Sequence, residues 1–140
     1  MQVQELMTKQ VISIRQDETA DVAARLLGSH NIGAAPVVDR EDKLVGMLTD
    51  RDLVVRCMAA GLQPERVDVS QIMTPGPMTA SPEEDAAGLT ARMGREQIRR
   101  VPVVQEGRLA GIVSLADLAR GGATGAAEAL RQISGNISRR

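Results

Sequence analysis

The chain of 140 residues contains no phenylalanine, tyrosine or tryptophan. Aromatic rings are the stacking platforms of proteins that bind unpaired bases, and they form the cages that hold methylated cations. Both kinds of site are therefore excluded. The hydrophobic core, which usually contains aromatic anchors, must be built here from Val, Ile, Leu, Met and Ala.

Histidine and cysteine occur once each, as His30 and Cys57. A Cys/His zinc site needs several such ligands and a disulfide needs two thiols, so one chain can form neither. The residue sets of Ser/His/Asp and Cys/His catalysis are missing, as are Gly-rich phosphate loops. We therefore expect no enzyme, no catalytic residues, no metal and no cofactor. His30 is expected to end a helix, and Cys57 to be a small buried hydrophobe.

The charge is balanced, with 17 Lys and Arg against 18 Asp and Glu. No bulk field attracts nucleic acid or anionic lipid, so we expect neither a nucleic-acid partner nor a membrane partner. No apolar run approaches the roughly 18 residues needed to span a bilayer, and the start of the chain lacks the features of a signal peptide. These observations predict a cytoplasmic protein.

Two parts of the sequence repeat one pattern, at an offset of 66 positions that later falls to 65. The recurring segments are Met7-Thr8 and Met73-Thr74, Pro36-Val37-Val38 and Pro102-Val103-Val104, and Gly46 and Gly111. The lost residue falls in a polar turn, where insertions and deletions are tolerated. The chain is therefore two copies of one unit.

Each copy predicts the element order strand, helix, strand, strand, helix. In the first copy, residues 11–14 form an apolar stretch and residues 17–30 have helical periodicity. Residues 35–39 and 44–49 are β-branched runs on either side of a polar turn, which predicts an antiparallel hairpin. A second helix is expected over residues 50–60, ending at Gly61.

The second copy has its own helix-start signal. Ser81 is expected to be the N-cap of its first helix, with Pro82 at the first helical position and Glu84 completing a capping box.

The predicted fold class is α/β with mixed α+β character. Residues 1–66 form the first repeat, residues 67–122 the second, and residues 123–140 a tail. One repeat alone would bury too little surface, so the two are expected to pack as a pseudo-twofold pair. Residues 63–70 are expected to be an ordered crossover, and Gly121 to Gly125 a flexible joint. Ala126, Leu130, Ile133 and Ile137 predict a short amphipathic helix in the tail.

The most informative segments are G-M-L-T-D-R-D, from Gly46 to Asp52, and its echo G-I-V-S-L-A-D, from Gly111 to Asp117. In each, a strand delivers a hydroxyl residue to the first turn of a helix, and an Asp follows three positions later. Free amides at such a helix start can bind phosphate, and the Asp can bind a ribose diol. The same [ST]-x-x-[DE] spacing also describes a capping box that needs no ligand. The pattern alone favours the cap.

The paired I-x-x-x-P-V-V and G-h-h-[ST]-x-x-D motifs (h apolar) resemble a tandem pair of CBS (cystathionine beta-synthase) domains, also called a Bateman module. The resemblance covers about residues 3 to 120. The stretches HNIGAAPVV and GMLTDRDLVVRCMAAGL further resemble small stand-alone bacterial proteins of this kind. The resemblance implies adenine nucleotides (AMP, ADP, ATP) or related adenosyl ligands in clefts between the repeats, and flat homodimers.

The resemblance also assigns residues to two binding sites. Thr49 and Ser114 would supply the hydroxyl on the phosphate side, and Asp52 and Asp117 the carboxylate that binds ribose. The apolar residues around adenine would be Val11, Ile12 and Ile32 in one cleft, and Met78, Ile98 and Pro102 in the other.

The two predicted sites differ in charge. Arg99 and Arg100 stand in the second repeat where the first has Gly33 and Ala34. The resemblance places Arg in a phosphate-contacting position there, and a guanidinium suits phosphate oxygens. An ordinary solvated face is the alternative for these arginines, and Arg51 is a similar case.

Two functions follow as hypotheses. The first is a non-catalytic sensor in which an adenine nucleotide shifts the arrangement of a homodimer or of an unidentified effector protein. The second is a ligand-free structural or interaction protein whose capping boxes are only caps and whose apolar tail helix docks on a partner protein. The homodimer is expected from the apolar helical spacing of Leu53, Val54, Cys57 and Met58. The tail helix is expected either to cross to the second copy or to lie over the ligand cleft.

Overall fold

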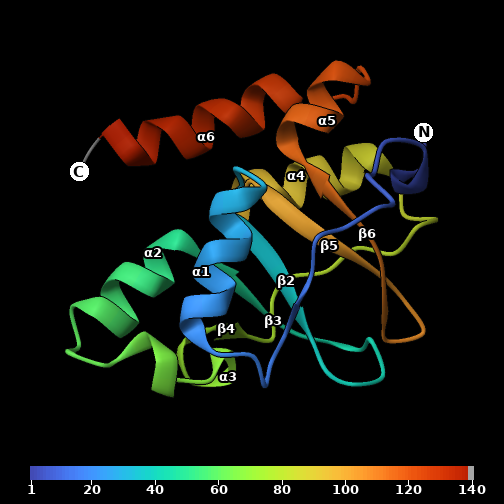
Figure 1. The fold of residues 1–140 in the computed structure, drawn as a ribbon. Coiled ribbons are helices and arrows are strands. Elements are labelled where there is room, and N and C mark those ends of the chain that lie inside the picture. The colour runs from blue at the N-terminus through green and yellow to red at the C-terminus, as the bar shows by residue number, and fades with distance from the viewer. Residues whose placement is uncertain (139–140) are drawn as a thin grey trace. The chain divides into compact units, whose positions relative to one another are not determined.

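The computed structural model describes residues 1–138, and the side chains of residues 136–138 lie outside the description. The chain forms helices and strands in two compact units (Figure 1). Unit 1 comprises Met1–Gln10, Met78–Glu106 and the chain from Ala110 onward. Unit 2 comprises Val11–Pro77 and Gly107–Leu109. The mixed α/β class with two repeated sets of elements is confirmed.

Unit 2 is built around a four-stranded sheet with the strand order β1-β2-β3-β4. β1 pairs in parallel with β2, and the other neighbouring strands are antiparallel. The predicted hairpin is therefore confirmed, as β2 and β3. The elements in chain order are β1 (Ile14–Arg15), α1 (Ala20–Ser29), β2 (Ala34–Val38), β3 (Leu44–Thr49), α2 (Asp50–Asp52), η2 (Leu53–Met58), η3 (Pro64–Arg66), α3 (Val69–Ile72) and β4 (Thr74–Pro75).

The core of unit 2 lies between α1 and the sheet. α1 buries Ala20, Ala23 and Leu27, which share one face because they are spaced three and four residues apart. Two predicted boundaries were wrong. α1 begins at Ala20 rather than at residue 17, and the first strand is only Ile14–Arg15, so Val11 and Ile12 lie outside it.

The helix predicted over residues 50–60 is also different. Only Asp50–Asp52 is α-helical, and Leu53–Met58 continues as a π-helix. Its amides bond five residues back, as in Ala59 N to Val54 O at 2.8 Å. The wider turn changes which side chains face inward, because the predicted helical spacing no longer applies. Cys57 is buried as expected, whereas Val54 and Met58 are exposed.

Unit 1 contains the second set of elements and the tail. These are η1 (Val3–Glu5), α4 (Ala86–Glu96), β5 (Arg100–Gln105), β6 (Arg108–Ser114), α5 (Leu115–Arg120) and α6 (Ala126–Ser138). β5 and β6 form a two-stranded sheet, and the first two residues of β6 group with unit 2. The strand predicted ahead of the first helix of the second copy is reduced to a single parallel bridge between Ala80 and Val103. The core includes Leu89, Met93 and Val113, and also Val3 from the N-terminal segment.

The predicted start of the helix in the second copy was wrong. α4 begins at Ala86, and its N-cap is Asp85, whose carboxylate accepts a bond from Gly88 N at 3.3 Å. Ser81 and Glu84 instead close a turn ahead of the helix, where Glu84 N donates to Ser81 O. The capping pattern therefore marks a turn four residues too early, because Asp85 competes for the same role.

Each Met-Thr pair lies against the glycine strand of the other sequence repeat. Thr8 pairs with Ile112 on β6, and a Cβ added to Gly111 would lie 2.8 Å from Thr8 O. Likewise Thr74 pairs with Met47 on β3, and a Cβ added to Gly46 would lie 2.8 Å from Thr74 O. The first segment of each sequence repeat therefore belongs to the compact unit that contains most of the other repeat. The boundaries 1–66, 67–122 and 123–140 stay a prediction about the repeats.

The crossover is packed into unit 2, where Val67 and Val69 are buried in the core. The crossover prediction is confirmed. At the start of the joint, Gly122 and Ala123 donate to the carbonyls of Ala119 and Leu118. The flexibility of the joint stays a prediction.

The tail forms α6, which packs on α4 and α5 (Figure 1). Ala126, Ala129 and Ile133 are buried in the core of unit 1, while Leu130 is 50% exposed. The amphipathic helix is therefore confirmed. The side chain of Ile137 lies outside the described part of the chain.

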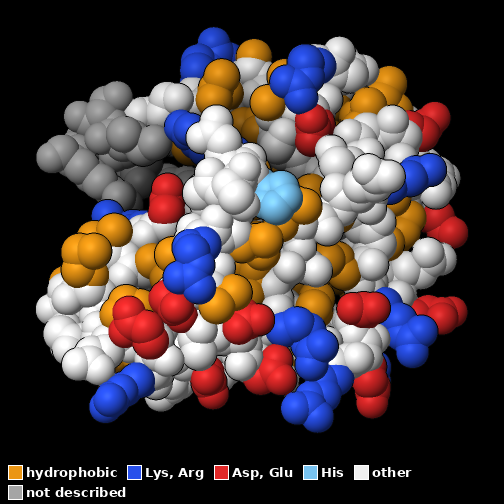
Figure 2. All heavy atoms as spheres, in the orientation of Figure 1, with side chains coloured by type: hydrophobic (Ala, Val, Ile, Leu, Met, Phe, Trp, Pro, Cys, Tyr) orange, Lys and Arg blue, Asp and Glu red, His pale blue; other side chains and the backbone are white. Residues whose placement is uncertain are grey.

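The surface carries both signs of charge. In the view of Figure 2, acidic and basic side chains are interspersed, as the sequence charge predicts. None of the helices described is long and apolar enough to cross a membrane.

Candidate functional site

A pocket of about 360 Å³ lies in unit 1, where β5, α5 and α6 meet. Its polar side is formed by Arg99, Arg100 and Ser114. The remaining wall is apolar and consists of Leu115, Ala116, Ala119, Ala126, Ala127 and Leu130. The structure thus brings together three of the residues that the resemblance assigned to phosphate.

The two guanidiniums at this pocket have no acidic partner. Neither Arg99 nor Arg100 forms a side-chain ion pair or hydrogen bond within the described residues. Arg92 on α4 behaves differently, because it binds Glu84 and the carbonyl of Thr79. Arg92 therefore has a structural role, whereas Arg99 and Arg100 present free guanidiniums at the pocket within the described part of the chain.

Ser114 and Thr49 are both N-caps with the same geometry. Ser114 Oγ accepts from Asp117 N at 3.0 Å, and Thr49 Oγ1 accepts from Asp52 N at 3.0 Å. The bond uses an oxygen lone pair and leaves the hydroxyl proton free to donate. Capping and ligand binding are therefore compatible at these hydroxyls.

The two predicted ribose carboxylates complete these capping boxes. Asp117 Oδ2 accepts from Ser114 N at 3.0 Å, and Asp52 Oδ2 accepts from Thr49 N at 3.0 Å. The second oxygen faces an arginine in each case. Asp117 Oδ1 lies 2.6 Å from Arg120 Nη2, and Asp52 Oδ1 lies 3.8 Å from Arg56 Nε. The capping reading is confirmed at both positions, and Asp117 does not line the pocket.

The apolar residues assigned to adenine are not part of the pocket wall. Ile98 and Met78 are half-buried against the core of unit 1, and Pro102 is buried within β5. In unit 2, Ile32 is half-buried against the core, and Val11 and Ile12 are half-buried in an irregular segment. Arg51 is exposed on α2.

The individual residues of the apolar pocket wall were not predicted from the sequence, although a tail helix over the ligand cleft was one of two predicted placements. Ala116 and Ala119 belong to α5, and Ala126, Ala127 and Leu130 belong to α6. The amphipathic spacing of the tail was the signal in the sequence, because a helix with an apolar face is expected to pack that face against other elements.

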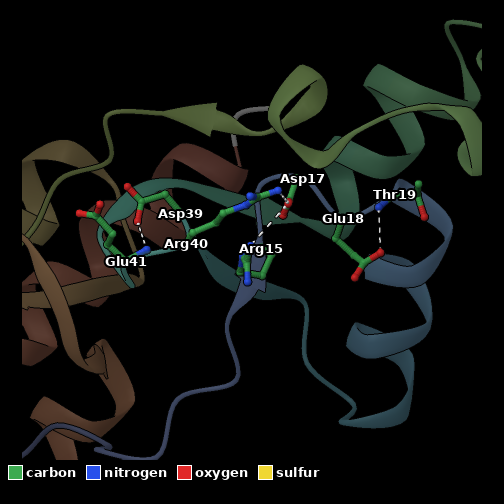
Figure 3. A network of polar contacts seen from close by, with 7 residues as sticks. All are labelled: Arg15, Asp17, Glu18, Thr19, Asp39, Arg40 and Glu41. Carbon is green, nitrogen blue, oxygen red and sulfur yellow. Dashed lines mark hydrogen bonds and ion pairs between the residues drawn. The ribbon is translucent and has the colours of Figure 1, made fainter.

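A second polar cluster lies in unit 2, at the end of β1 and in the β2–β3 turn (Figure 3). Asp17 lies 3.5 Å from both Arg15 and Arg40, and Asp39 accepts from the Glu41 amide at 2.8 Å. A pocket of about 330 Å³ is lined by Gln16, Asp17, Asp39, Arg40 and Glu41. Each charge there already has a partner close by in the turn, so the cluster is explained by the local fold.

The described residues contain no group of three or more His, Cys, Asp and Glu side chains arranged to hold a metal ion. The absence of a metal stays a prediction from the sequence.

The sequence matches the CBS domain family over residues 3–58 and 69–124. Hypoxic response protein 1 of Mycobacterium tuberculosis is 37% identical over 116 residues, covering 83% of this chain and 81% of that protein. A crystal structure of Hypoxic Response Protein I with two coordinated zinc ions has a TM-score of 0.79 and 36% identity, covering 86% of this chain and 98% of that one.

A further structural relative is the CBS domain pair of protein MJ0100, in complex with 5′-methylthioadenosine and S-adenosyl-L-methionine. It is 30% identical with a TM-score of 0.75, covering 87% of this chain and 99% of that one. The similarity to small CBS-pair proteins of the hypoxic response type is therefore confirmed. Because the family model matches both repeats, the chain belongs to the CBS domain family, as a tandem CBS pair.

Proposed function

We propose that this CBS pair is a non-catalytic sensor that binds an adenine nucleotide or a related adenosyl compound. One observation carries the proposal. Two guanidiniums that have no acidic partner among the described residues lie together with a capping hydroxyl at a pocket with an apolar wall. Guanidiniums left without a carboxylate suit the oxygens of an anionic ligand, because each presents several donors in a fixed plane.

The size and chemistry of the pocket fit such a ligand. Its volume of about 360 Å³ falls within the range of small-molecule sites, about 300 to 1,000 Å³. A nucleotide has a charged phosphate end and a flat, largely apolar base. Arg99, Arg100 and Ser114 suit the phosphate, and the alanine and leucine wall suits an apolar surface. The chain has no aromatic side chain, so any contact to the base must be aliphatic.

The ribose contact of Asp117 belongs to the same proposal. Its Oδ2 accepts the backbone bond of the capping box, which leaves Oδ1 as the oxygen without a backbone partner to accept from a ribose hydroxyl. That oxygen is now bound by Arg120, whose side chain is 73% exposed. An exposed pair of this kind contributes little to stability, so a ligand can replace it at small cost. Ile98, Met78 and Pro102 remain proposed adenine contacts.

We also propose a second site in unit 2, which binds phosphate more weakly. Thr49, Asp52 and Arg51 are its polar residues, and Val11, Ile12 and Ile32 its apolar ones. Gly33 and Ala34 occupy the positions that Arg99 and Arg100 occupy in the unit 1 site. We expect the Arg-bearing site to bind the charged ligand more tightly.

The known relatives support this reading. The CBS pair of MJ0100 is a complex with two adenosyl compounds, which is the class proposed here. A ligand with different affinity for two arrangements of a dimer or of an effector protein shifts their populations. Its place in the cytoplasm stays a prediction from the sequence.

An alternative function is a ligand-free interaction protein. Both capping boxes are closed without any ligand, and Val54, Val55, Met58 and Leu62 form an exposed apolar patch. Isothermal titration of the full chain with AMP, ATP and S-adenosylmethionine separates the two functions. Saturable binding of at least one compound supports the sensor, and heats no larger than dilution for all three support the alternative.

A further inference from the structure

The tail helix α6 lies outside the part of the chain that matches the CBS family, which ends at residue 124. Yet Ala126, Ala127 and Leu130 of this helix form part of the pocket wall beside Arg99 and Arg100. A helix outside the matched segment therefore contributes to the site that we propose for the nucleotide.

A second face of α6 packs on α4 and holds the helix in place. Ala129 and Ile133 are buried in the core of unit 1, against α4. Gly94 on α4 permits this approach, because a Cβ at that position would clash with Oε1 of Gln132 and would lie 3.0 Å from Ala129 Cα, both on α6. Gly28 is the equivalent residue of α1, and a Cβ there would meet nothing within 4 Å. The glycine of α4 is thus needed for docking, and that of α1 is not.

The pocket face of α6 leaves room for a ligand. Its residues include two alanines, and the pocket has its volume with the helix docked. Leu130 is 50% exposed, so much of its side chain is available for contact. A ligand in the pocket can therefore touch α6 without displacing it.

We propose that α6 is the ligand-sensing element of this chain, whose docking on α4 and nucleotide binding in the pocket stabilise each other. The proposal rests on the proposed function. A ligand that contacts the docked helix binds more weakly when the helix is undocked, because part of the wall is then missing. Linkage is reciprocal, so the bound ligand must hold the helix in place by the same factor.

The pocket face is tested with Leu130→Glu, and Gly135→Glu is its control, because a Cβ added at Gly135 would meet nothing within 4 Å. Both substitutions add one carboxylate to an exposed position of α6, but only residue 130 lines the pocket. The introduced carboxylate at 130 can pair with Arg99 or Arg100 and repel phosphate. We expect AMP to bind about tenfold more weakly to Leu130→Glu, with little change in Gly135→Glu. The loss for uncharged 5′-methylthioadenosine should be smaller.

The docking face is tested with Gly94→Ala, and Gly28→Ala is its control. Gly94 does not line the pocket, so any effect on AMP must pass through α6. If the variant helix is docked one tenth of the time, affinity falls about tenfold. Amide hydrogen exchange over residues 126–135 reports docking directly. We expect AMP to slow this exchange in the unaltered chain, and Gly94→Ala to speed it.

The outcomes separate the two proposals. If the unaltered chain binds none of the adenosyl compounds, the proposed function fails and the role of α6 falls with it. If the chain binds AMP but Leu130→Glu and Gly94→Ala match their controls, or exchange in α6 does not change with AMP, the sensing role of α6 alone is overturned. Thermal unfolding establishes that each variant is folded. Leu130→Glu keeps the test decisive if Gly94→Ala is not folded, because Leu130 is half exposed.

Discussion

Ser114 and Thr49 have the same cap geometry in different surroundings. Both accept a 3.0 Å bond from the amide three residues on, but only Ser114 lies beside Arg99 and Arg100. Replacement by Ala should cost each variant about 0.5 to 2 kcal/mol of unfolding free energy. Ser114→Ala should also weaken AMP binding more than Thr49→Ala does. Urea unfolding and titration of the two variants check this, and an equal loss of AMP affinity in both would contradict the unequal sites.

Gly46 is a residue where a methyl group has no room. An added Cβ would lie 2.5 Å from Met73 Sδ and 2.8 Å from the carbonyl oxygen of Thr74. The backbone oxygen cannot give way as a side chain can, so Gly46→Ala should lower the free energy of unfolding by about 1 to 3 kcal/mol. Gly28→Ala is the control, because that helical position is open and Ala favours a helix. Equal stability of the two variants by urea unfolding would refute the close approach.

At the residue scale, local patterns were predictable and distant contacts were not. The spacing of Thr49 and Asp52 contains the whole capping box, since both partners lie within one turn. The contact of Gly46 with Met73 joins residues far apart in the sequence. The sequence repeat shows that the glycine and the Met-Thr pair each occur twice. It does not show that the glycine of one repeat contacts the Met-Thr pair of the other.

The β2–β3 turn is an element whose stability should depend on pH. Asp39 Oδ1 accepts from the Glu41 amide (Figure 3) and also from the Lys43 amide, and these bonds lower the pKa of the Asp39 carboxyl below its ordinary value of 3.8. The stabilisation is full above that ordinary pKa and is lost as the pH falls through the lowered one. Asp39→Ala should therefore be less stable than the unaltered chain at neutral pH, and the difference should shrink in acid.

Gln105 occupies the equivalent position in the other hairpin and does not titrate. Any stability difference caused by Gln105→Ala should have no such acid dependence. Urea unfolding over a pH series compares the variants. A difference for Asp39→Ala that is the same at every pH would show that the charged form of Asp39 does not hold the turn.

At the element scale, the sequence predicted which elements exist better than where they begin. The hairpin of β2 and β3 follows from two β-branched runs and a polar turn. The start of α4 was placed too early because several residues ahead of it can cap a helix. Leu53–Met58 is a π-helix, whose periodicity differs from the 3.6 residues per turn assumed for the sequence. The exposure of Val55 was therefore not predicted.

The whole molecule is expected to be a homodimer. Val54 is 52%, Val55 47% and Met58 72% exposed, and Leu62 adds to this apolar patch of unit 2. Hydrophobic side chains gather over α2 and the segment after it in Figure 2. Identical chains most often pair through a twofold interface, which would bury such a patch against a second copy.

Met58→Glu should dissociate this dimer, because it places a charge in the apolar patch. Gln132→Glu, which adds the same charge on α6, should leave it intact. Light scattering at matched concentrations gives the masses. A monomeric unaltered chain, or a Met58→Glu protein that is still dimeric, would contradict the assignment of this surface.

At the molecular scale, the repeat and its paired motifs identified the family before any contact was known. The binding pocket was only half predictable. Arg99, Arg100 and Ser114 belong to the family motifs, whereas the wall from α6 belongs to a segment outside the CBS match.

The central claim is that free guanidiniums at the unit 1 pocket hold the anionic end of a nucleotide. Titration of AMP into the unaltered chain, Arg100→Ala and Arg95→Ala, at low and high salt, tests it most directly. Arg95 is an exposed control on α4 that does not line the pocket. The account predicts salt-sensitive binding that weakens about tenfold or more in Arg100→Ala and stays nearly unchanged in Arg95→Ala. An unaltered chain that does not bind AMP, or equal affinities for the two variants, would contradict it.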